Sequence, residues 1–319
     1  MTTPVPPLRI GTRRSPMAIV QAGYVASLIT QRTGRAVELV RVTTFGDVSR
    51  AQLSQIGGTG VFVSGLRARL LADEVDIAVH SLKDLPTAEA EGIVLAAVPA
   101  RDDPRDALVT VDGAKLADLR AGARIGTGSP RRAAQLRLLR PDTTPVAVRG
   151  NADTRIAKVG KGQLDAVVLG YAGLARIGRL DAVAEVFEPD EMLPAPGQGA
   201  LAVECRSGAA ELRALLATVD DPSSHTAITA ERSLLAALQG GCSAPVGAYA
   251  VHTLGTDMVH LSAGVFDIDG GGAVRAGGDG KAAAAQSLGR EIAEELLHRG
   301  AGNYISVLSA RSSDGGDPQ

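Results

Sequence analysis

The chain has 319 residues, 45% of them hydrophobic, and a formal net charge of -2 at pH 7, so it is long enough for roughly two or three domains. The near-neutral charge argues against general binding to nucleic acid or to an anionic membrane, and the 3% aromatic content argues against base-stacking surfaces. There is no long apolar run and no signal-peptide pattern, so we expect a cytoplasmic protein with no membrane or nucleic-acid partner.

The first third of the chain alternates between strand and helix patterns. Residues 8–12 are a predicted strand, and Ser15 with Pro16 is typical of the cap and first turn of a helix, which we expect to run to about residue 28. Further elements predicted here are a strand at 36–42, a helix at 63–73, and strands at 76–80 and 93–98. The alternation predicts an α/β unit.

A second α/β unit follows the RDDPRD segment at 101–106, which we interpret as a break between units. Its predicted elements are a strand at 124–128, a helix from Pro130, a strand at 145–150, a helix from about Ala152, and a strand at 165–170. The proline- and glycine-rich stretch 193–206 ends in a strand-like run, which we expect to return the chain to the first unit.

The remainder changes character. It has a predicted helix at 223–238, short strands within 247–253, 258–267 and 273–278, and a last helix at about 282–298. We therefore predict an α/β fold of two lobes and a small C-terminal α+β domain. The predicted domains are 1–100 with 200–218, then 101–199, then 219–319.

Charged residues cluster directly after predicted strands, where open α/β sheets bind their ligands. They are Arg13 and Arg14, Lys83 and Asp84, Arg131 and Arg132, and Arg149 and Arg155. In GTGSPRR, Ser129 can cap a helix whose positive end lies beside two guanidinium groups, which suits a carboxylate or phosphate. Several arginines together suit a ligand with many carboxylates.

The two cysteines, Cys205 and Cys242, indicate neither a disulfide framework nor a zinc site, and the five histidines lack metal-ligand spacing, so we expect no metal. Cys242 lies in the glycine-flanked turn QGGCSAPVG. Its spacing alone leaves open a partly buried thiol or a reactive nucleophile. Likewise, Asp84 could pair with Lys83, cap a turn or take part in catalysis.

Five motifs, in order, resemble the porphobilinogen deaminase (hydroxymethylbilane synthase) family, with matching spacing from Leu8 to about Leu308. They are HSLKDLP (80–86), GTGSPRRAAQL (126–136), RGNADTR (149–155), LPAPGQGALAVECR (193–206) and ERSLLAALQGGCSAPVG (231–247). The resemblance implies two lobes like those of periplasmic binding proteins, with a central cleft, and a third domain carrying the cysteine loop.

The resemblance also implies a transferase of tetrapyrrole (heme and porphyrin) biosynthesis. Its substrate would be porphobilinogen, of which four are joined head to tail with loss of ammonia, and hydrolysis would release the linear product. The cofactor would be dipyrromethane, attached to Cys242 through a thioether. Since each ring carries an acetate and a propionate, six linked rings would bring about a dozen carboxylates to the arginines.

Site residues follow from the same matching. Asp84 would be catalytic, stabilising a cationic azafulvene through its pyrrole N–H. Besides Cys242, the predicted cofactor contacts are Lys83, Asp84, Ser129, Arg131 and Arg132. The predicted substrate contacts are Arg13, Ser15, Phe62, Arg149, Arg155 and Arg176. We expect a monomer that hands its product transiently to the next enzyme of the pathway.

The chain departs from the family pattern at five positions. Gln55, Thr59 and Ser64 stand where many members have lysine, Phe45 where a basic residue is common, and Gly128 where a hydroxyl residue is usual. These changes leave open the carboxylate contacts of the loop around 55–64. The alternative function is a non-catalytic, two-lobed anion-binding or effector-sensing protein, which would need neither Cys242 nor Asp84.

Overall fold

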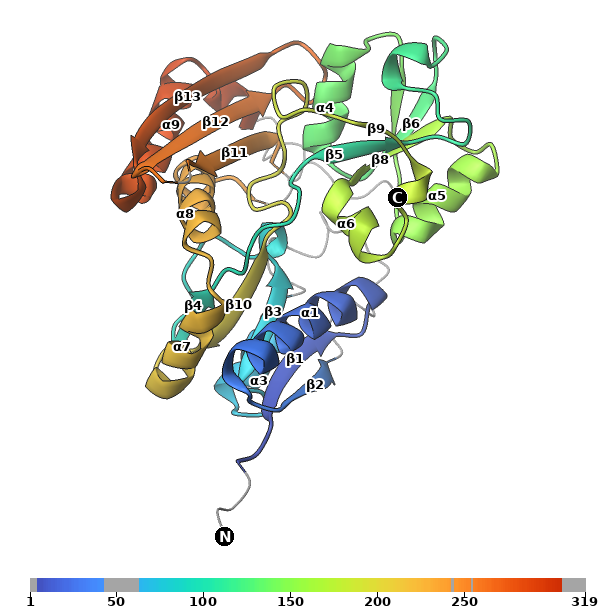
Figure 1. Ribbon diagram of the computed structural model, residues 1–319. Coiled ribbons are helices and arrows are strands. Elements are labelled where there is room, and N and C mark those ends of the chain that lie inside the picture. The colour runs from blue at the N-terminus through green and yellow to red at the C-terminus, as the bar shows by residue number, and fades with distance from the viewer. Residues whose placement is uncertain (1–4, 43–62, 242–243, 254, 306–319) are drawn as a thin grey trace, which may run out of the picture. The chain divides into compact units, whose positions relative to one another are not determined.

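The computed structural model describes residues 5–42, 63–241, 244–253 and 255–305. Its contacts divide the chain into two compact units (Figure 1). The first comprises Met1–Arg101 and Ala200–His225, and the second Asp102–Gly199 and Thr226–Gln319. Each unit is described on its own. The three predicted domains and the cleft between the lobes stay predictions.

The first unit contains a five-stranded sheet of order β2-β1-β3-β10-β4. Its strands are β1 (Leu8–Arg13), β2 (Val37–Val42), β3 (Ile77–Ser81), β4 (Ile93–Ala97) and β10 (Leu201–Arg206). β1 pairs in parallel with both β2 and β3, whereas β10 runs antiparallel to β3 and β4. The strand-like end of the stretch 193–206 is therefore β10, inside the first sheet.

Helices cover both faces of this sheet. They are α1 (Pro16–Thr33), α3 (Ser64–Leu71) and α7 (Ala210–Leu216). Alternate residues of β3 face opposite sides, so Ile77 packs in the cluster that contains α1, and Ala78 in the cluster that contains α3. The helix predicted to end near residue 28 continues to Thr33, where Gly34, at φ 69°, closes it by donating its N–H to Thr30 O.

The second unit repeats this arrangement in a sheet of order β7-β6-β8-β5-β9. Its strands are β5 (Asp106–Val109), β6 (Arg124–Thr127), β7 (Thr144–Ala147), β8 (Ala166–Gly170) and β9 (Val183–Val186). β6 is parallel to its neighbours β7 and β8, and β5 is antiparallel to β8 and β9. Two strands, β5 and β9, were not predicted, and β5 begins inside the segment interpreted as a break.

The helices of this sheet are α4 (Pro130–Leu139), α5 (Ala152–Gly160) and α6 (Tyr171–Arg176). Leu136 of α4 packs with Ile125 and Val168 on one face, and Val159 of α5 packs with Val167 on the other. The alternation of Val167 and Val168 along β8 explains why both faces of the strand are apolar. Both faces therefore have a helix-covered core.

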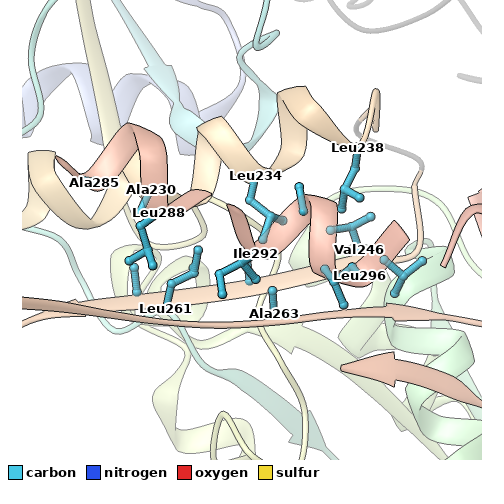
Figure 2. Close-up of a cluster of buried hydrophobic side chains, with 14 of the residues drawn as sticks. Ala230, Leu234, Leu238, Val246, Leu261, Ala263, Ala285, Leu288, Ile292 and Leu296 are labelled. Atoms are coloured by element: carbon cyan, nitrogen blue, oxygen red, sulfur yellow. The ribbon is translucent and has the colours of Figure 1, made fainter. Parts of the chain in front are cut away.

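A third, antiparallel sheet, β11-β12-β13, carries the C-terminal core. Its elements are β11 (Val246–His252), β12 (Met258–Phe266), β13 (Ala273–Lys281), α8 (Pro222–Ala237) and α9 (Ala285–His298). Figure 2 shows Leu234 of α8 and Ile292 of α9 directed toward β12, where they pack in one cluster with Leu261 and Ala263. Among the described residues, no helix has the length and apolar character to cross a membrane.

Candidate functional site

In the first unit, the predicted site residues follow two neighbouring strands. Arg13 is the last residue of β1, and Ser15 caps α1, its Oγ accepting from Ala18 N at 3.3 Å. Lys83 and Asp84 end the short 3-10 helix η1 (Leu82–Asp84) that follows β3. Since β1 and β3 are parallel neighbours, these residues lie at one edge of the sheet.

The turn that carries Asp84 is anchored by the leucines on either side. Leu82 and Leu85 are 1% and 4% exposed, and Leu82 N–H donates to Ala200 O at 3.0 Å. The N–H of Leu85 closes the turn on Leu82 O, also at 3.0 Å. Asp84 is exposed and Lys83 half-buried. The carboxylate is thus presented to solvent from a fixed backbone.

A buried ionic group supports β3 just before this turn. Glu204 of β10 accepts from Arg67 Nε at 3.1 Å and Nη2 at 2.7 Å, and His80 Nε2 lies 3.1 Å from Glu204 Oε2. Burial alone would raise the pKa of Glu204, but His80 and Arg67 hold that pKa below its usual value. This group ties α3 and β10 to the strand that leads to Asp84.

In the second unit, the predicted residues follow three adjacent parallel strands. Ser129, Arg131 and Arg132 come after the central strand β6; Arg149 and Arg155 follow β7, and Arg176 ends the helix after β8. Ser129 caps α4, its Oγ accepting from Arg132 N at 3.4 Å. The strand order therefore brings these residues to one edge, as the sequence predicted.

Arg131 and Arg132 share one buried carboxylate, Asp106 of β5, which has no exposed surface. Arg131 Nη2 donates to Asp106 Oδ2 at 2.7 Å. Arg132 donates to Oδ1 from Nε at 3.0 Å and from Nη2 at 2.7 Å, and Gln198 Nε2 adds a bond of 2.8 Å. Arg131 also donates to Leu193 O. The pair is thus held rigidly, with one carboxylate for two cations.

The charged groups in this cluster shift the pKa values of Asp106 and Arg131. Burial alone would raise the pKa of Asp106, but Arg131 and Arg132 hold it far below its ordinary value. Burial lowers the pKa of Arg131, and Arg132 lowers it further, whereas Asp106 opposes both effects. Ionised Asp106 therefore stabilises the fold.

We expect Asp106→Asn to lower the free energy of unfolding by about 3–5 kcal/mol at pH 7, since it leaves two buried guanidinium groups without their counter-charge. The folded pKa of Asp106 lies below the unfolded value of about 3.9, so its contribution is complete above that pH and is lost as the pH falls further. Urea unfolding from pH 7 to pH 3 should show a constant gap from the parent chain that shrinks below about pH 4.

Asp153→Asn is the control, because Asp153 is 59% exposed and pairs with Arg179 at the surface. Its effect should stay below about 1 kcal/mol. Equal losses for the two variants would contradict the structural role given to Asp106.

Arg155 differs from the arginine pair. Its Nε donates to Gly150 O at 2.8 Å, and it forms no ion pair within the described part of the chain. Burial lowers the pKa of Arg155, and the neighbouring charge of Arg132 lowers it further. A Cβ added at Gly128 would lie 3.0 Å from Val148 O and 3.8 Å from both Nη atoms of Arg155, so this glycine allows a close approach of the backbone to Val148 and to the cation. The positive charge of Arg155, beside that of Arg132, favours the binding of an anion at this position.

Arg176 is engaged within the second unit. It donates from Nε to Asp102 Oδ2 at 2.9 Å and from Nη2 to Gly199 O at 2.7 Å. Its side chain is only 13% exposed. Arg149, by contrast, is exposed. Substrate contacts by either residue stay predictions.

Several predicted residues lie outside the described residues. They are Cys242 and Phe62, together with Phe45, Gln55 and Thr59. Ser64 is described and begins α3. The described residues contain no cluster of three or more histidine, cysteine or acidic side chains that could hold a metal ion.

Three buried polar residues were missed by the sequence analysis: Asp106, Gln198 and Glu231. Asp106 stood in the segment read as a break, and its partners Arg131 and Arg132 lie more than twenty residues away in the chain. For Gln198 and Glu231 the sequence offered one signal of a functional role, their position inside motifs already singled out.

Comparison with known proteins relates both parts of the chain to one family. Residues 8–214 match the model "Porphobilinogen deaminase, dipyromethane cofactor binding domain", and residues 225–298 match "Porphobilinogen deaminase, C-terminal domain". The porphobilinogen deaminase of Thermobifida fusca is 56% identical over 313 residues, covering 95% of this chain and 97% of the relative. Porphobilinogen deaminase 1 of Streptomyces coelicolor is 55% identical, covering 93% and 97%.

Solved structures give weaker matches. A periplasmic substrate-binding protein of an ABC transporter from Coxiella burnetii aligns at 15% identity with a TM-score of 0.43, covering 67% of this chain and 92% of that one. The methionine-binding protein MetQ aligns at 12% identity with a TM-score of 0.43, covering 66% and 89%.

Proposed function

The chain belongs to the porphobilinogen deaminase family, and we propose that it joins four porphobilinogens head to tail, with loss of ammonia, to make hydroxymethylbilane for tetrapyrrole biosynthesis. The observation that carries this function is the cationic edge of the second sheet. Arg132 lies beside Arg155 there, and Arg131 and Arg132 share a single carboxylate, that of Asp106. Such a site suits a substrate rich in carboxylates. The relatives are named as deaminases, which disfavours the non-catalytic alternative.

The residues of the second unit fit a dipyrromethane cofactor. When attached to Cys242, this group supplies the primer on which condensation begins. We propose that its carboxylates are held by Ser129 and by Arg132, whose nitrogens already donate to Asp106, Gln198 and Val168 O, so that a cofactor carboxylate would share these donors. Arg131 is predicted as a further contact, and its Nη atoms are likewise engaged, with Leu193 O and Asp106. Its first effect is therefore to hold the carboxylate that orients Arg132.

Asp84 is the proposed catalytic carboxylate. Its exposure and its anchored turn allow the carboxylate to accept a hydrogen bond from a pyrrole N–H and to stabilise positive charge that develops as ammonia leaves. Lys83, the preceding residue, is half-buried and is proposed to hold a carboxylate of the cofactor.

The remaining proposed contacts bind the substrate and the growing chain. In the first unit these are Arg13 and Ser15, at the edge that Asp84 shares. In the second they are Arg149, Arg155 and Arg176, and Phe62 completes the set. Arginine's planar fork suits the acetate and propionate groups of each ring.

Intact mass under denaturing conditions tests the function. After incubation with porphobilinogen, the purified chain should gain the mass of two porphobilinogens less two ammonias, and ammonia should then be released continuously. An unmodified chain that releases no ammonia would reject the function and leave the anion-binding alternative.

A cytoplasmic location, a monomeric state and a transient handover to the next enzyme are also proposals. The first is supported by the absence of a membrane-spanning helix among the described residues. The other two depend on the family's function alone. Light scattering of the purified chain would test the monomer.

A further inference from the structure

Residues 193–199 (LPAPGQG), here called the bridge segment, form an irregular stretch in which six of the seven residues are buried. An irregular buried segment must have its backbone polar groups satisfied by neighbours. In the second unit Arg176 of α6 binds Gly199 O, and other neighbours come from two sides. One side is α4 with β5, and the other is β11 with α8.

The side toward α4 is held by the residues that surround the arginine pair. Gln135 exchanges two hydrogen bonds with Leu193, donating from Nε2 to the carbonyl at 3.1 Å and accepting from the N–H at 2.9 Å. Gln198 Nε2 donates to Asp106 Oδ1 at 2.8 Å, and its Oε1 accepts from Arg132 Nη2 at 3.2 Å. Gln198 is thus oriented by an anionic acceptor, Asp106, and a cationic donor, Arg132.

The side toward the third sheet is held by Glu231 of α8, which has no exposed surface. Its Oε2 accepts from Gly197 N at 2.7 Å and its Oε1 from Ala250 N at 2.8 Å. The N–H of Ala248 also donates to Pro194 O at 2.9 Å. A Cβ added at Gly247 would lie 2.6 Å from Leu193 Cβ, so the segment is packed directly on β11.

The chemistry of Glu231 is specific to this role. A buried carboxylate is costly unless its oxygens are hydrogen-bonded, and here each oxygen meets a backbone N–H from a different element. Glutamine has the same shape, but its amide NH2 would face one of these N–H donors. The site therefore requires two acceptors, which a carboxylate supplies and an amide does not.

We propose that the bridge segment fixes the arginine pair relative to the end of α8, from which the chain runs through Gln239–Gly241 into Cys242. Glu231 and Gln198 are its two positioning residues, one on each side. Because Arg132 is proposed to hold the group that Cys242 anchors, a change in the spacing between α4 and the end of α8 should slow attachment. This inference rests on the proposed function.

Two readouts test the proposal in the full chain. The first is hydrogen exchange of the α4 peptide (Pro130–Leu139) in the purified protein, which needs no cofactor. In Glu231→Gln, exchange in α4 should rise about tenfold although the substitution is in α8. The second is the rate of dipyrromethane attachment to the unmodified chain supplied with porphobilinogen, followed by intact mass. It should fall about tenfold.

Leu234→Ala is the matched control. Leu234 is a buried residue of the same helix that packs in the core shared with α9. Leu234→Ala should lower the melting temperature, while the rate of dipyrromethane attachment stays within about twofold of that of the parent chain. Equal slowing in this control, or an unchanged attachment rate and α4 exchange in Glu231→Gln, would overturn the proposal.

Gln198→Ala perturbs the bridge segment on the side toward α4. It replaces Glu231→Gln as the test variant if Glu231→Gln fails to fold. When both substitutions are combined, the attachment rate should fall no further than in the worse single variant, since both act through one segment. Fully multiplicative effects would contradict the shared role. If the parent chain itself gains no adduct, the proposed function fails, while α4 exchange still decides the structural coupling.

Discussion

Cys242→Ser should abolish covalent attachment of dipyrromethane and reduce ammonia release from porphobilinogen to the uncatalysed background. Attachment would form a bond between Sγ and the aminomethyl carbon, break the bond from that carbon to the amino nitrogen, and transfer the thiol proton to the nitrogen, which leaves as ammonia. A thiol is far more acidic and nucleophilic than a hydroxyl, so serine lacks the reactive group. Intact mass after incubation with porphobilinogen should show the adduct in the parent chain and none in the variant.

Cys205→Ala is the control for this experiment. Cys205 lies in β10 with no exposed surface, and burial raises the pKa of its thiol. It is therefore a core residue that stays protonated, and the alanine variant should gain the full adduct at a small cost in stability. An adduct that persisted in Cys242→Ser and disappeared in Cys205→Ala would reverse the assignment of the anchor.

The alternation of strands and helices was predictable because local patterns carry it. Ser15 and Pro16 mark the start of α1, and Ser129 and Pro130 that of α4, through capping contacts confined to a few residues. β5 was missed because its first residue is a charged aspartate after a proline-containing segment. Asp106 belongs in a strand only because Arg131 and Arg132 neutralise it there, and such a distant pairing leaves no periodic signal.

The same limit applies to the site. Position after strands correctly placed Arg132 and Arg155 at one edge of the second sheet, since strand order follows a general rule. Pattern alone cannot tell the buried Arg131, bound to Asp106 and Leu193, from Arg155, which forms no ion pair with the described residues. Burial and partner decide that difference, and both depend on residues brought in by the fold.

Asp84→Asn should lower the rate of ammonia release by about 10²–10⁴-fold, because the amide cannot carry the negative charge that opposes the cation formed as ammonia leaves. Dipyrromethane attachment should survive at least in part, since Cys242 and the arginines of the second unit remain. The substitution keeps the shape of an exposed side chain, so the anchored turn between Leu82 and Leu85 should persist. Single-turnover ammonia release and intact mass on the same sample separate the two effects.

Glu89→Gln is the matched control, because Glu89 is an exposed carboxylate a few residues farther along the same connection. It removes the same charge from the same unit but leaves the carboxylate at the end of η1 in place, so ammonia release should stay within about twofold. If loss of general charge were the cause, both variants would slow alike. Near-normal turnover by Asp84→Asn would instead show that the carboxylate at the end of η1 is not the group that stabilises the developing cation.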